Sequence, residues 1–105
     1  MTDRLSHLRL MAAENPGDPF FHYAQAMEYL AQGSVSEAIL CLKSTIDIFP
    51  DYLPSFHLIS RCLIEQDHLK SAEIYLHRGI ELAAQQRNNK AHAEMRALLG
   101  EIDNF

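Results

Sequence analysis

The sequence predicts an all-α fold built from repeated helical hairpins, and two observations lead to this prediction. First, the chain matches itself when shifted by thirty-four residues, which is about the length of one helix–turn–helix unit that must stack on a neighbour. The matched positions are Gln32 with Gln66, Ala38 with Ala72, Leu42 with Leu76 and Ile46 with Ile80. Second, apolar residues recur with helical spacing, and no useful length of chain alternates with period two. We therefore expect about six helices and no β-sheet.

The first two helices are separated by a turn-rich segment, residues 15–19, with the sequence Asn-Pro-Gly-Asp-Pro. The preceding helix is expected over about residues 3–14, where leucines form one stripe. Asp18 is a typical N-cap for the second helix, and Pro19 suits its first turn because a missing N–H costs nothing there. The second helix should end just before Gly33, which readily adopts the left-handed conformation of a helix end.

The later helices are placed by prolines and by polar turns. Pro50 ends the third helix, whereas Pro54 fits only as an early residue of the fourth. Asn88 or Asn89 is expected to cap a sixth helix after a polar stretch. The third to sixth helices are expected over about residues 34–49, 53–66, 69–84 and from 89 onward.

With this period, the sequence resembles the tetratricopeptide-repeat (TPR) family over nearly its whole length. In that family, small residues lie where the two helices of a unit press together, bulky residues surround them, and a proline follows the second helix. The matching residues are Ala26, Tyr29, Gly33, Ala38 and Pro50 in the first unit, and Phe56, Ser60, Leu63, Ala72, Tyr75 and Gly79 in the second. The resemblance implies a TPR-type α-solenoid of antiparallel helices that form a short right-handed superhelix.

The same resemblance implies how the chain is organised. We expect a single TPR domain over residues 1–105. Its parts are an N-terminal orphan helix in 1–17, a first repeat in 19–52, a second repeat in 53–86 and a C-terminal capping helix in 87–105. Three positions depart from the family pattern: His22 replaces a large aromatic residue, Gln25 replaces Leu, and Ala84 replaces the closing proline. Without that proline, we expect a longer or looser connection to the last helix.

Composition and charge exclude several classes of function. The chain carries a net charge of −5 and no cluster of Lys or Arg, so binding to nucleic acid or to an anionic membrane surface is not expected. No stretch approaches the roughly 18 apolar residues of a membrane span. The N-terminus lacks the apolar block of a secretion signal, and the two cysteines form no metal-like or redox-like pair, which favours a cytoplasmic protein.

No arrangement of residues predicts catalysis, so we do not expect an enzyme, a metal site or a cofactor. The six histidines are dispersed, and none forms the helical pair that binds zinc. His57 and His92 hold near-equivalent positions in successive units, which leaves a weak metal site as an open alternative. Cys41 and Cys62 are interpreted as packing residues rather than nucleophiles.

The resemblance implies that the first helices of the units line a concave groove that binds a peptide. Helical spacing places Phe20, Tyr23, Met27 and Leu30 there in the first unit, His57, Arg61 and Glu65 in the second, and His92 and Met95 in the last helix. Two alternatives remain open. The aromatic and methionine residues of the first unit can instead be core beneath the N-terminal helix, and Arg61 with Glu65 can be an ordinary helical ion pair.

The function that fits these features best is a protein–protein interaction module, an adaptor or assembly factor, that binds a peptide or an amphipathic helix. Some TPR proteins grip the carboxylates of chaperone tails with Lys and Asn in this stripe, but other residue types hold those positions here, so that ligand is disfavoured. The alternative is a structural protein that forms homo-oligomers through the last helix. Its candidate contact residues are Leu98, Leu99, Ile102 and Phe105.

Overall fold

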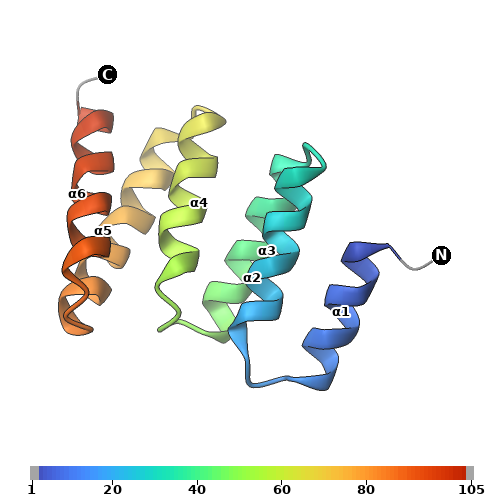
Figure 1. Cartoon of the computed structure of the whole chain (residues 1–105). Coiled ribbons are helices and arrows are strands. Elements are labelled where there is room, and N and C mark those ends of the chain that lie inside the picture. Colours follow the sequence, from blue (N-terminus) through green and yellow to red (C-terminus); the bar gives the residue numbers. More distant parts are fainter. Residues whose placement is uncertain (1–2, 104–105) are drawn as a thin grey trace. The chain divides into compact units, whose positions relative to one another are not determined.

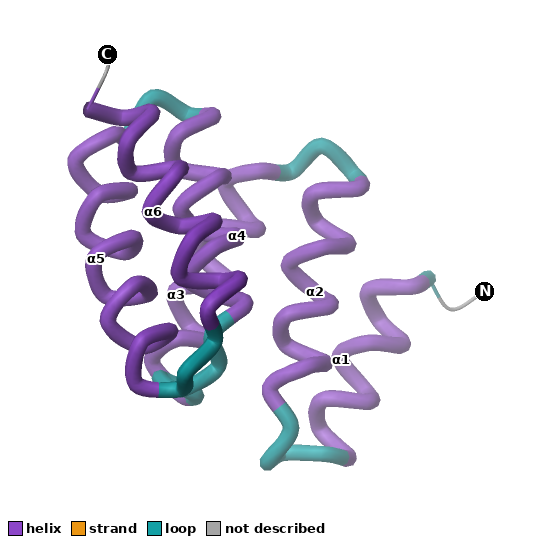
Figure 2. Tube along the Cα trace, turned by 60° about the vertical axis from the view of Figure 1, so that its left-hand side comes forward, coloured by secondary structure: helices purple, strands orange, loops and turns teal. Residues whose placement is uncertain are grey.

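The computed structural model describes residues 3–103 and contains, within that range, six α-helices and no strand (Figures 1 and 2). The helices are α1 (Arg4–Glu14), α2 (Pro19–Ala31), α3 (Val35–Ile48), α4 (Pro54–Glu65), α5 (Leu69–Gln85) and α6 (Asn89–Asp103). These bounds agree with the predicted ones to within a residue or two, which is the usual uncertainty of a helix end. The predicted all-α fold class is confirmed.

The chain divides into two compact units, with the boundary between Tyr52 and Leu53. Unit 1 contains α1, α2 and α3, and unit 2 contains α4, α5 and α6. In each unit, helices that follow one another in the sequence pack side by side and antiparallel, joined by short turns (Figure 1). The predicted organisation into one domain with repeats in 19–52 and 53–86 stays a prediction.

Helix starts follow the predicted capping chemistry at two places. The Asp18 carboxylate accepts a hydrogen bond from the backbone N–H of Phe20 at 2.9 Å, and the Asn88 side chain accepts one from the N–H of Ala91 at 3.0 Å. Ser34 precedes α3, but its side chain makes no capping hydrogen bond. Asp18 and Asn88 therefore satisfy backbone donors that would otherwise lack an intrahelical partner.

Three helices end in a left-handed residue, although the sequence pattern indicated this only at Gly33. The backbone φ angles are 78° at Gly33, 65° at Asp67 and 57° at Arg87. After Gly33, the N–H of Ser34 bonds back to the carbonyl of Tyr29 at 2.8 Å, which is the hydrogen bond of a Schellman motif, and equivalent bonds follow the other two residues. The motif provides hydrogen bonds to carbonyl groups in the last turn of the helix. It forms at Asp67 and Arg87 even though their side chains make the left-handed conformation costly.

The connection before α6 is short, which corrects the expectation of a longer or looser one. Helix α5 continues through Ala84 to Gln85, and only residues 86–88 separate it from α6, compared with residues 49–53 between α3 and α4. The Schellman motif at Arg87 and the cap at Asn88 stop α5 and start α6 without a proline.

The core of unit 1 lies at the crossing of α2 and α3. Ala26 and Ala38 are fully buried there, as the small-residue pattern predicts, and Leu42 and Ile46 are buried beside them. Small side chains at a crossing allow the two helix axes to approach closely.

The core of unit 2 has the same small residues between α4 and α5 but adds larger side chains. Ser60 and Ala72 are fully buried, and the Ser60 hydroxyl donates to the Phe56 carbonyl at 2.7 Å. A Cβ added to Gly79 of α5 would lie 2.6 Å from the Met95 Sδ and 2.9 Å from the Phe56 Cβ. Gly79 thus lets α5 approach both α4 and α6 closely.

Candidate functional site

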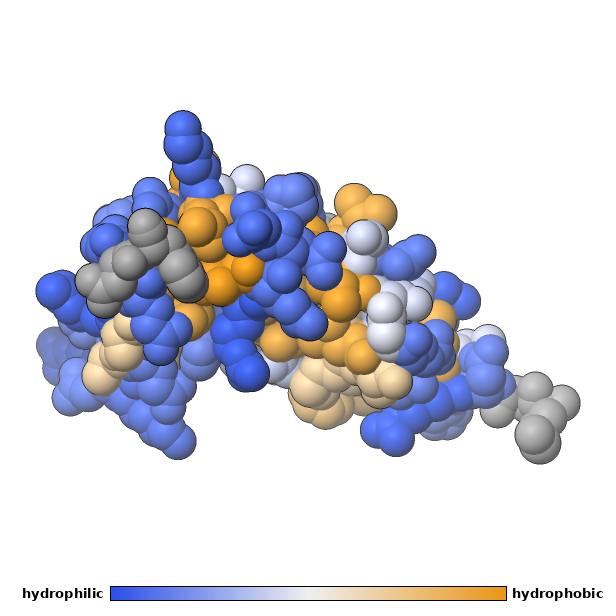
Figure 3. All heavy atoms as spheres, turned by 90° about the horizontal axis from the view of Figure 1, so that it is seen from above, coloured by the Kyte–Doolittle hydropathy of each residue, from blue (hydrophilic) through white to orange (hydrophobic). Residues whose placement is uncertain are grey.

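An apolar stripe on α2 is exposed in unit 1. Phe20 is 47% exposed and Met27 is 40% exposed, and the two lie on one helix face because they are two turns apart. Tyr23 lies between them, half-buried, with its ring edge-on to the Tyr52 ring at 5.7 Å between centroids. Leu30 extends the stripe and is half-buried. Figure 3 shows, for one face of the molecule, patches of apolar surface between hydrophilic side chains.

Helix α1 packs against α2 but leaves Phe20 and Met27 partly exposed, so it does not cover this stripe completely. The Arg9 guanidinium donates to the Tyr29 hydroxyl at 2.8 Å, and Arg4 lies 3.4 Å from the Glu28 carboxylate. Tyr29 is nine residues from Phe20, which places it on the opposite side of α2, whereas Glu28 lies beside Met27 in the sequence. The exposed face of α2 is therefore available to a partner.

In unit 2, the predicted stripe on α4 is polar and partly engaged with α6. The His57 Nδ1 lies 3.6 Å from the Glu94 carboxylate, which also lies 3.9 Å from the Lys90 ammonium. Burial lowers the pKa of His57 below its ordinary value, against the opposing effect of Glu94, so the ring is mostly neutral at pH 7. The contact is too long for a hydrogen bond, and because desolvation is the larger effect we interpret it as a carboxylate beside a mostly neutral imidazole rather than as a full ion pair.

Arg61 and Glu65 are both exposed on α4. No ion pair joins them in the described part of unit 2, so the alternative of a simple i, i+4 pair has no support there. Their charged groups are available to solvent or to a partner.

The last helix does not present the predicted methionine. Met95 is completely buried, because it fills the space that Gly79 leaves open next to Phe56. It is a core residue of unit 2, and its prediction as a groove residue is wrong. His92 is half-buried on the same helix.

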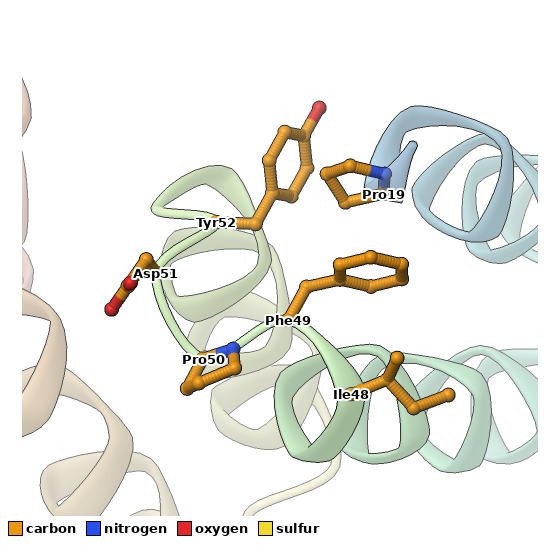
Figure 4. A pocket seen from close by; sticks show the side chains of 6 residues that line it. All are labelled: Pro19, Ile48, Phe49, Pro50, Asp51 and Tyr52. Atoms are coloured by element: carbon orange, nitrogen blue, oxygen red, sulfur yellow. The ribbon is translucent and has the colours of Figure 1, made fainter. Parts of the chain in front are cut away.

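Sequence reasoning missed a pocket in unit 1, where the first turn of α2 meets the end of α3 (Figure 4). Its volume is about 360 Å³, and its lining residues are Pro19, Ile48, Phe49, Pro50, Asp51 and Tyr52. We interpreted Pro50 and Asp51 in the sequence only as a helix stop. The available signal was the pair of aromatic residues that flanks them, Phe49 and Tyr52.

Each unit of the described chain contains one free thiol. Burial raises the pKa of both Cys41 and Cys62, and the Cys41 thiol donates to the His22 carbonyl at 3.3 Å. A raised pKa keeps a thiol protonated and unreactive. Within residues 3–103, side chains of His, Cys, Asp and Glu form no group of three or more that could hold a metal ion. Among the helices of the same range, none combines the length and hydropathy that crossing a membrane requires.

The antiparallel hairpins, with small residues buried at their crossings, define a TPR-type helical-repeat fold, and solved structures share it. A tetratricopeptide repeat domain protein from Salinibacter ruber, solved by NMR, matches with a TM-score of 0.81 at 24% identity, covering 86% of this chain and 91% of that one. A protein from Bordetella parapertussis matches with a TM-score of 0.81 at 16% identity, covering 99% of this chain and 90% of that one.

The type III secretion translocator chaperone SycD from Yersinia enterocolitica has a TM-score of 0.83 at 17% identity, over 94% of this chain and 69% of its own. At these identities the likeness establishes the fold. No family model matches the sequence, and no curated protein matches it.

Proposed function

We propose that this protein is an interaction module, an adaptor or assembly factor, that binds a peptide or an amphipathic helix of a partner protein. The observation on which the proposal rests is the exposure of Phe20 and Met27 on one face of α2. Exposed aromatic residues often anchor protein interfaces, and Met adapts to partners of different shape. The polar stripe of α4, with Arg61 and Glu65, offers charged contacts in unit 2. The name of one structural neighbour, a translocator chaperone, describes a protein that acts on other proteins, which supports the same class of function.

The test is affinity purification of the tagged protein from its native cell, followed by quantitative mass spectrometry. We expect the double variant Phe20→Ala with Met27→Ala to lose its main co-purifying partner by about tenfold or more, because truncation of buried interface anchors has effects of this size. The matched control combines Leu40→Ala with Ile74→Ala. These side chains are exposed, at 66% and 61%, but lie on α3 and α5. Equal capture by both double variants, with unchanged unfolding midpoints, would contradict the proposal for α2.

Arg61→Glu tests the contribution of unit 2 in the same experiment. Arg61 is exposed and lacks an ion pair in the described chain, so the charge reversal should leave the free energy of unfolding nearly unchanged. We expect it to weaken partner capture. Normal capture by this variant would restrict the binding surface to unit 1.

Self-association is the second candidate, and a hollow on unit 2 favours it. The hollow lies between α5 and α6, has a volume of about 320 Å³, and is lined in part by Ile80 and Leu99. Of the residues predicted for this contact, Leu98 and Leu99 are half-buried, Ile102 is buried in unit 2 and so is corrected to a core residue, and Phe105 lies outside the described residues. Light scattering over a wide concentration range tests this candidate, and a strict monomer would remove it.

A further inference from the structure

The pocket at the end of α3 has a mostly apolar lining, and its two aromatic rings are held by α2. Figure 4 shows the rings of Phe49, Tyr52 and Pro19 around one space. The Tyr52 ring meets the Tyr23 ring edge-on at 5.7 Å between centroids, and the Phe49 ring centroid lies 5.5 Å from that of His22. Since contacts with α2 already order both aromatic rings, a ligand would lose little free energy in fixing them.

The pocket offers few hydrogen-bonding groups to a ligand. Pro19 and Pro50 have no backbone N–H. The N–H groups of Phe49 and Tyr52 already donate to backbone carbonyls, at 2.7 Å and 3.1 Å. Figure 4 shows the Asp51 carboxylate pointing away from the rings. A ligand that fits this pocket must therefore bind mainly through apolar contacts with the rings.

The Tyr52 hydroxyl is a polar group at the rim of the pocket. Figure 4 shows it at the outer end of its ring, on the side away from Phe49. Burial, with smaller contributions from Tyr23 and Asp18, raises the pKa of Tyr52, so the phenol keeps its proton for donation. The hydroxyl can therefore donate to a carbonyl of a ligand that lies across the rings.

We propose that this pocket receives a proline residue of the partner peptide, which lies across the rings of Phe49 and Tyr52 in an extended polyproline II conformation. Aromatic-lined grooves bind proline in this conformation, and a proline has no N–H that would need an acceptor. The backbone carbonyls of a polyproline II segment form no internal hydrogen bonds, so one of them is free to accept from the Tyr52 hydroxyl. The same two rings already face Pro19 of the protein itself (Figure 4), which is a contact of the same kind.

Other modes of peptide recognition fit this pocket less well. Strand addition requires a free sheet edge, and residues 3–103 contain no strand. A helix in a groove needs apolar surface along several helical turns, whereas this pocket is formed by the first turn of α2, the end of α3 and the segment that follows α3. Recognition of proline through aromatic rings needs neither feature.

This inference rests on the proposed function, because it assigns one residue of the peptide that α2 would bind. The contact between Tyr23 and Tyr52 connects the two surfaces inside unit 1: Tyr23 belongs to the exposed stripe, and Tyr52 lines the pocket. The partner peptide is therefore expected to carry a proline next to the apolar residues that contact Phe20 and Met27.

Three short peptides serve as probes on the full-length, ¹⁵N-labelled protein. The test peptide is Ac-Ala-Pro-Pro-Pro-Ala-amide, and the controls are Ac-Ala-Ala-Ala-Ala-Ala-amide and Ac-Ala-Ala-Leu-Ala-Ala-amide. We expect the proline peptide to shift the amide resonances of Phe20, Phe49 and Tyr52. It should bind at least about fivefold more tightly than either control, because it already has the bound conformation. Its affinity should change little between about 0.01 M and about 0.15 M salt, because the contact is uncharged.

Two variants and one control locate the effect. Tyr52→Leu keeps apolar bulk and removes the ring, so it should weaken binding of the proline peptide by about five- to tenfold. Tyr52→Phe keeps the ring and removes the hydroxyl, so it should weaken binding by about two- to fivefold. The control is Tyr75→Leu, which removes a half-buried tyrosine ring from unit 2. Thermal unfolding of each variant verifies that it is folded, and Tyr52→Phe decides the matter if Tyr52→Leu is not.

Three outcomes would overturn the inference. One is equal or tighter binding of a control peptide, which in the case of leucine would assign the pocket to an aliphatic side chain. Another is an equal effect of Tyr52→Leu and Tyr75→Leu on the proline peptide, and the third is the absence of shifts at Phe49 and Tyr52. Such a failure leaves the proposed function standing, since that proposal is tested by partner capture with variants of Phe20 and Met27. Neither of those two side chains lines the pocket, so the two proposals can fail independently.

Discussion

Unit 1 and unit 2 are both built from three antiparallel helices, but they differ in how many large apolar side chains they leave exposed. In the described chain, the exposed large apolar residues are Leu10, Phe20, Met27, Leu40 and Ile48 in unit 1 and only Ile74 in unit 2. Unit 2 instead buries Phe56, Ile59, Leu76 and Met95 almost completely. Unit 1 therefore leaves more large apolar side chains exposed to solvent, whereas unit 2 buries most of its own in its core.

Met27 and Met95 show the difference at a single repeat position. They are two repeat periods apart in the sequence, yet Met27 is 40% exposed and Met95 is fully buried. The helix that packs against Met95 provides Gly79, and the corresponding position of α1 holds Met11. Met11 has a long side chain at the position where Gly79 has none, and Met95 fills the space beside Gly79. The repeat thus sets where a side chain lies along its helix, while the residue opposite decides whether it is buried.

The largest expected effect tests this pair directly. Met95→Ala should lower the free energy of unfolding by about 2–5 kcal/mol, because it opens a cavity beside Gly79 and Phe56. Met27→Ala, its matched control, should change it by less than about 0.5 kcal/mol, as expected for an exposed side chain. Urea unfolding followed by circular dichroism measures both. Similar losses for the two variants would mean that Met27 is also a core residue.

The next effect tests the close approach at Gly79. Gly79→Ala should cost about 1–3 kcal/mol of unfolding free energy, because the new Cβ meets the rigid Cβ of Phe56 as well as the flexible sulfur of Met95. Gly100→Ala is the control, since an added Cβ on α6 meets nothing within 4 Å. It should stabilise the protein by up to about 1 kcal/mol through helix propensity. If both variants changed the free energy of unfolding in the same direction, Gly79 would not control the packing of unit 2.

Substitutions at the left-handed residues that end the helices should have a smaller effect on stability, with opposite signs in the two units. Gly33→Ala in unit 1 should lower stability by about 1 kcal/mol, because alanine resists the positive φ of that turn. Arg87→Gly in unit 2 should raise stability by up to about 1 kcal/mol for the same reason. Thermal unfolding of the two variants measures the difference, and a loss of stability in Arg87→Gly would contradict it.

The smallest effect is a dependence on pH through unit 2. Because burial lowers the pKa of His57 below 6.5, the unfolded chain binds that proton more tightly than the folded one. The contribution of His57 is therefore complete above pH 6.5 and is lost as pH falls through the lowered pKa. His57→Gln should show a weaker fall of Tm than the unmodified protein between about pH 7.5 and pH 5.5. A steeper fall of Tm in the variant would mean that the pKa of His57 is raised, not lowered, in the folded protein.

Periodicity was sufficient to predict the fold class, and the prolines, Gly33 and the capping residues placed the helix bounds, because these signals are local. The small residues at the crossings followed from the resemblance to the TPR family. The sequence also identified Phe20 and Met27 as a stripe on one face. It did not identify Met95 as core, because that outcome depends on Gly79, a residue of another helix. Helical spacing alone does not reveal which residue lies opposite.

The pocket at the end of α3 was beyond the sequence pattern for a related reason. Its walls come from the first turn of α2 and from the segment after α3, so it exists only when the two ends meet. The left-handed residues Asp67 and Arg87 were missed because neither is a glycine, the residue type that signals this conformation. In both cases tertiary packing determined a feature that local propensity did not indicate.

The two cysteines offer a way to measure local opening in each unit separately. Cys41 is half-buried in unit 1, whereas Cys62 is buried in unit 2. An alkylating reagent modifies a buried sulfur such as that of Cys62 only when the surrounding helices separate transiently, whereas Cys41 needs a smaller local opening. Peptide mass spectrometry can follow the labelling rate of each cysteine separately. Each rate therefore measures how often the helices around that cysteine open.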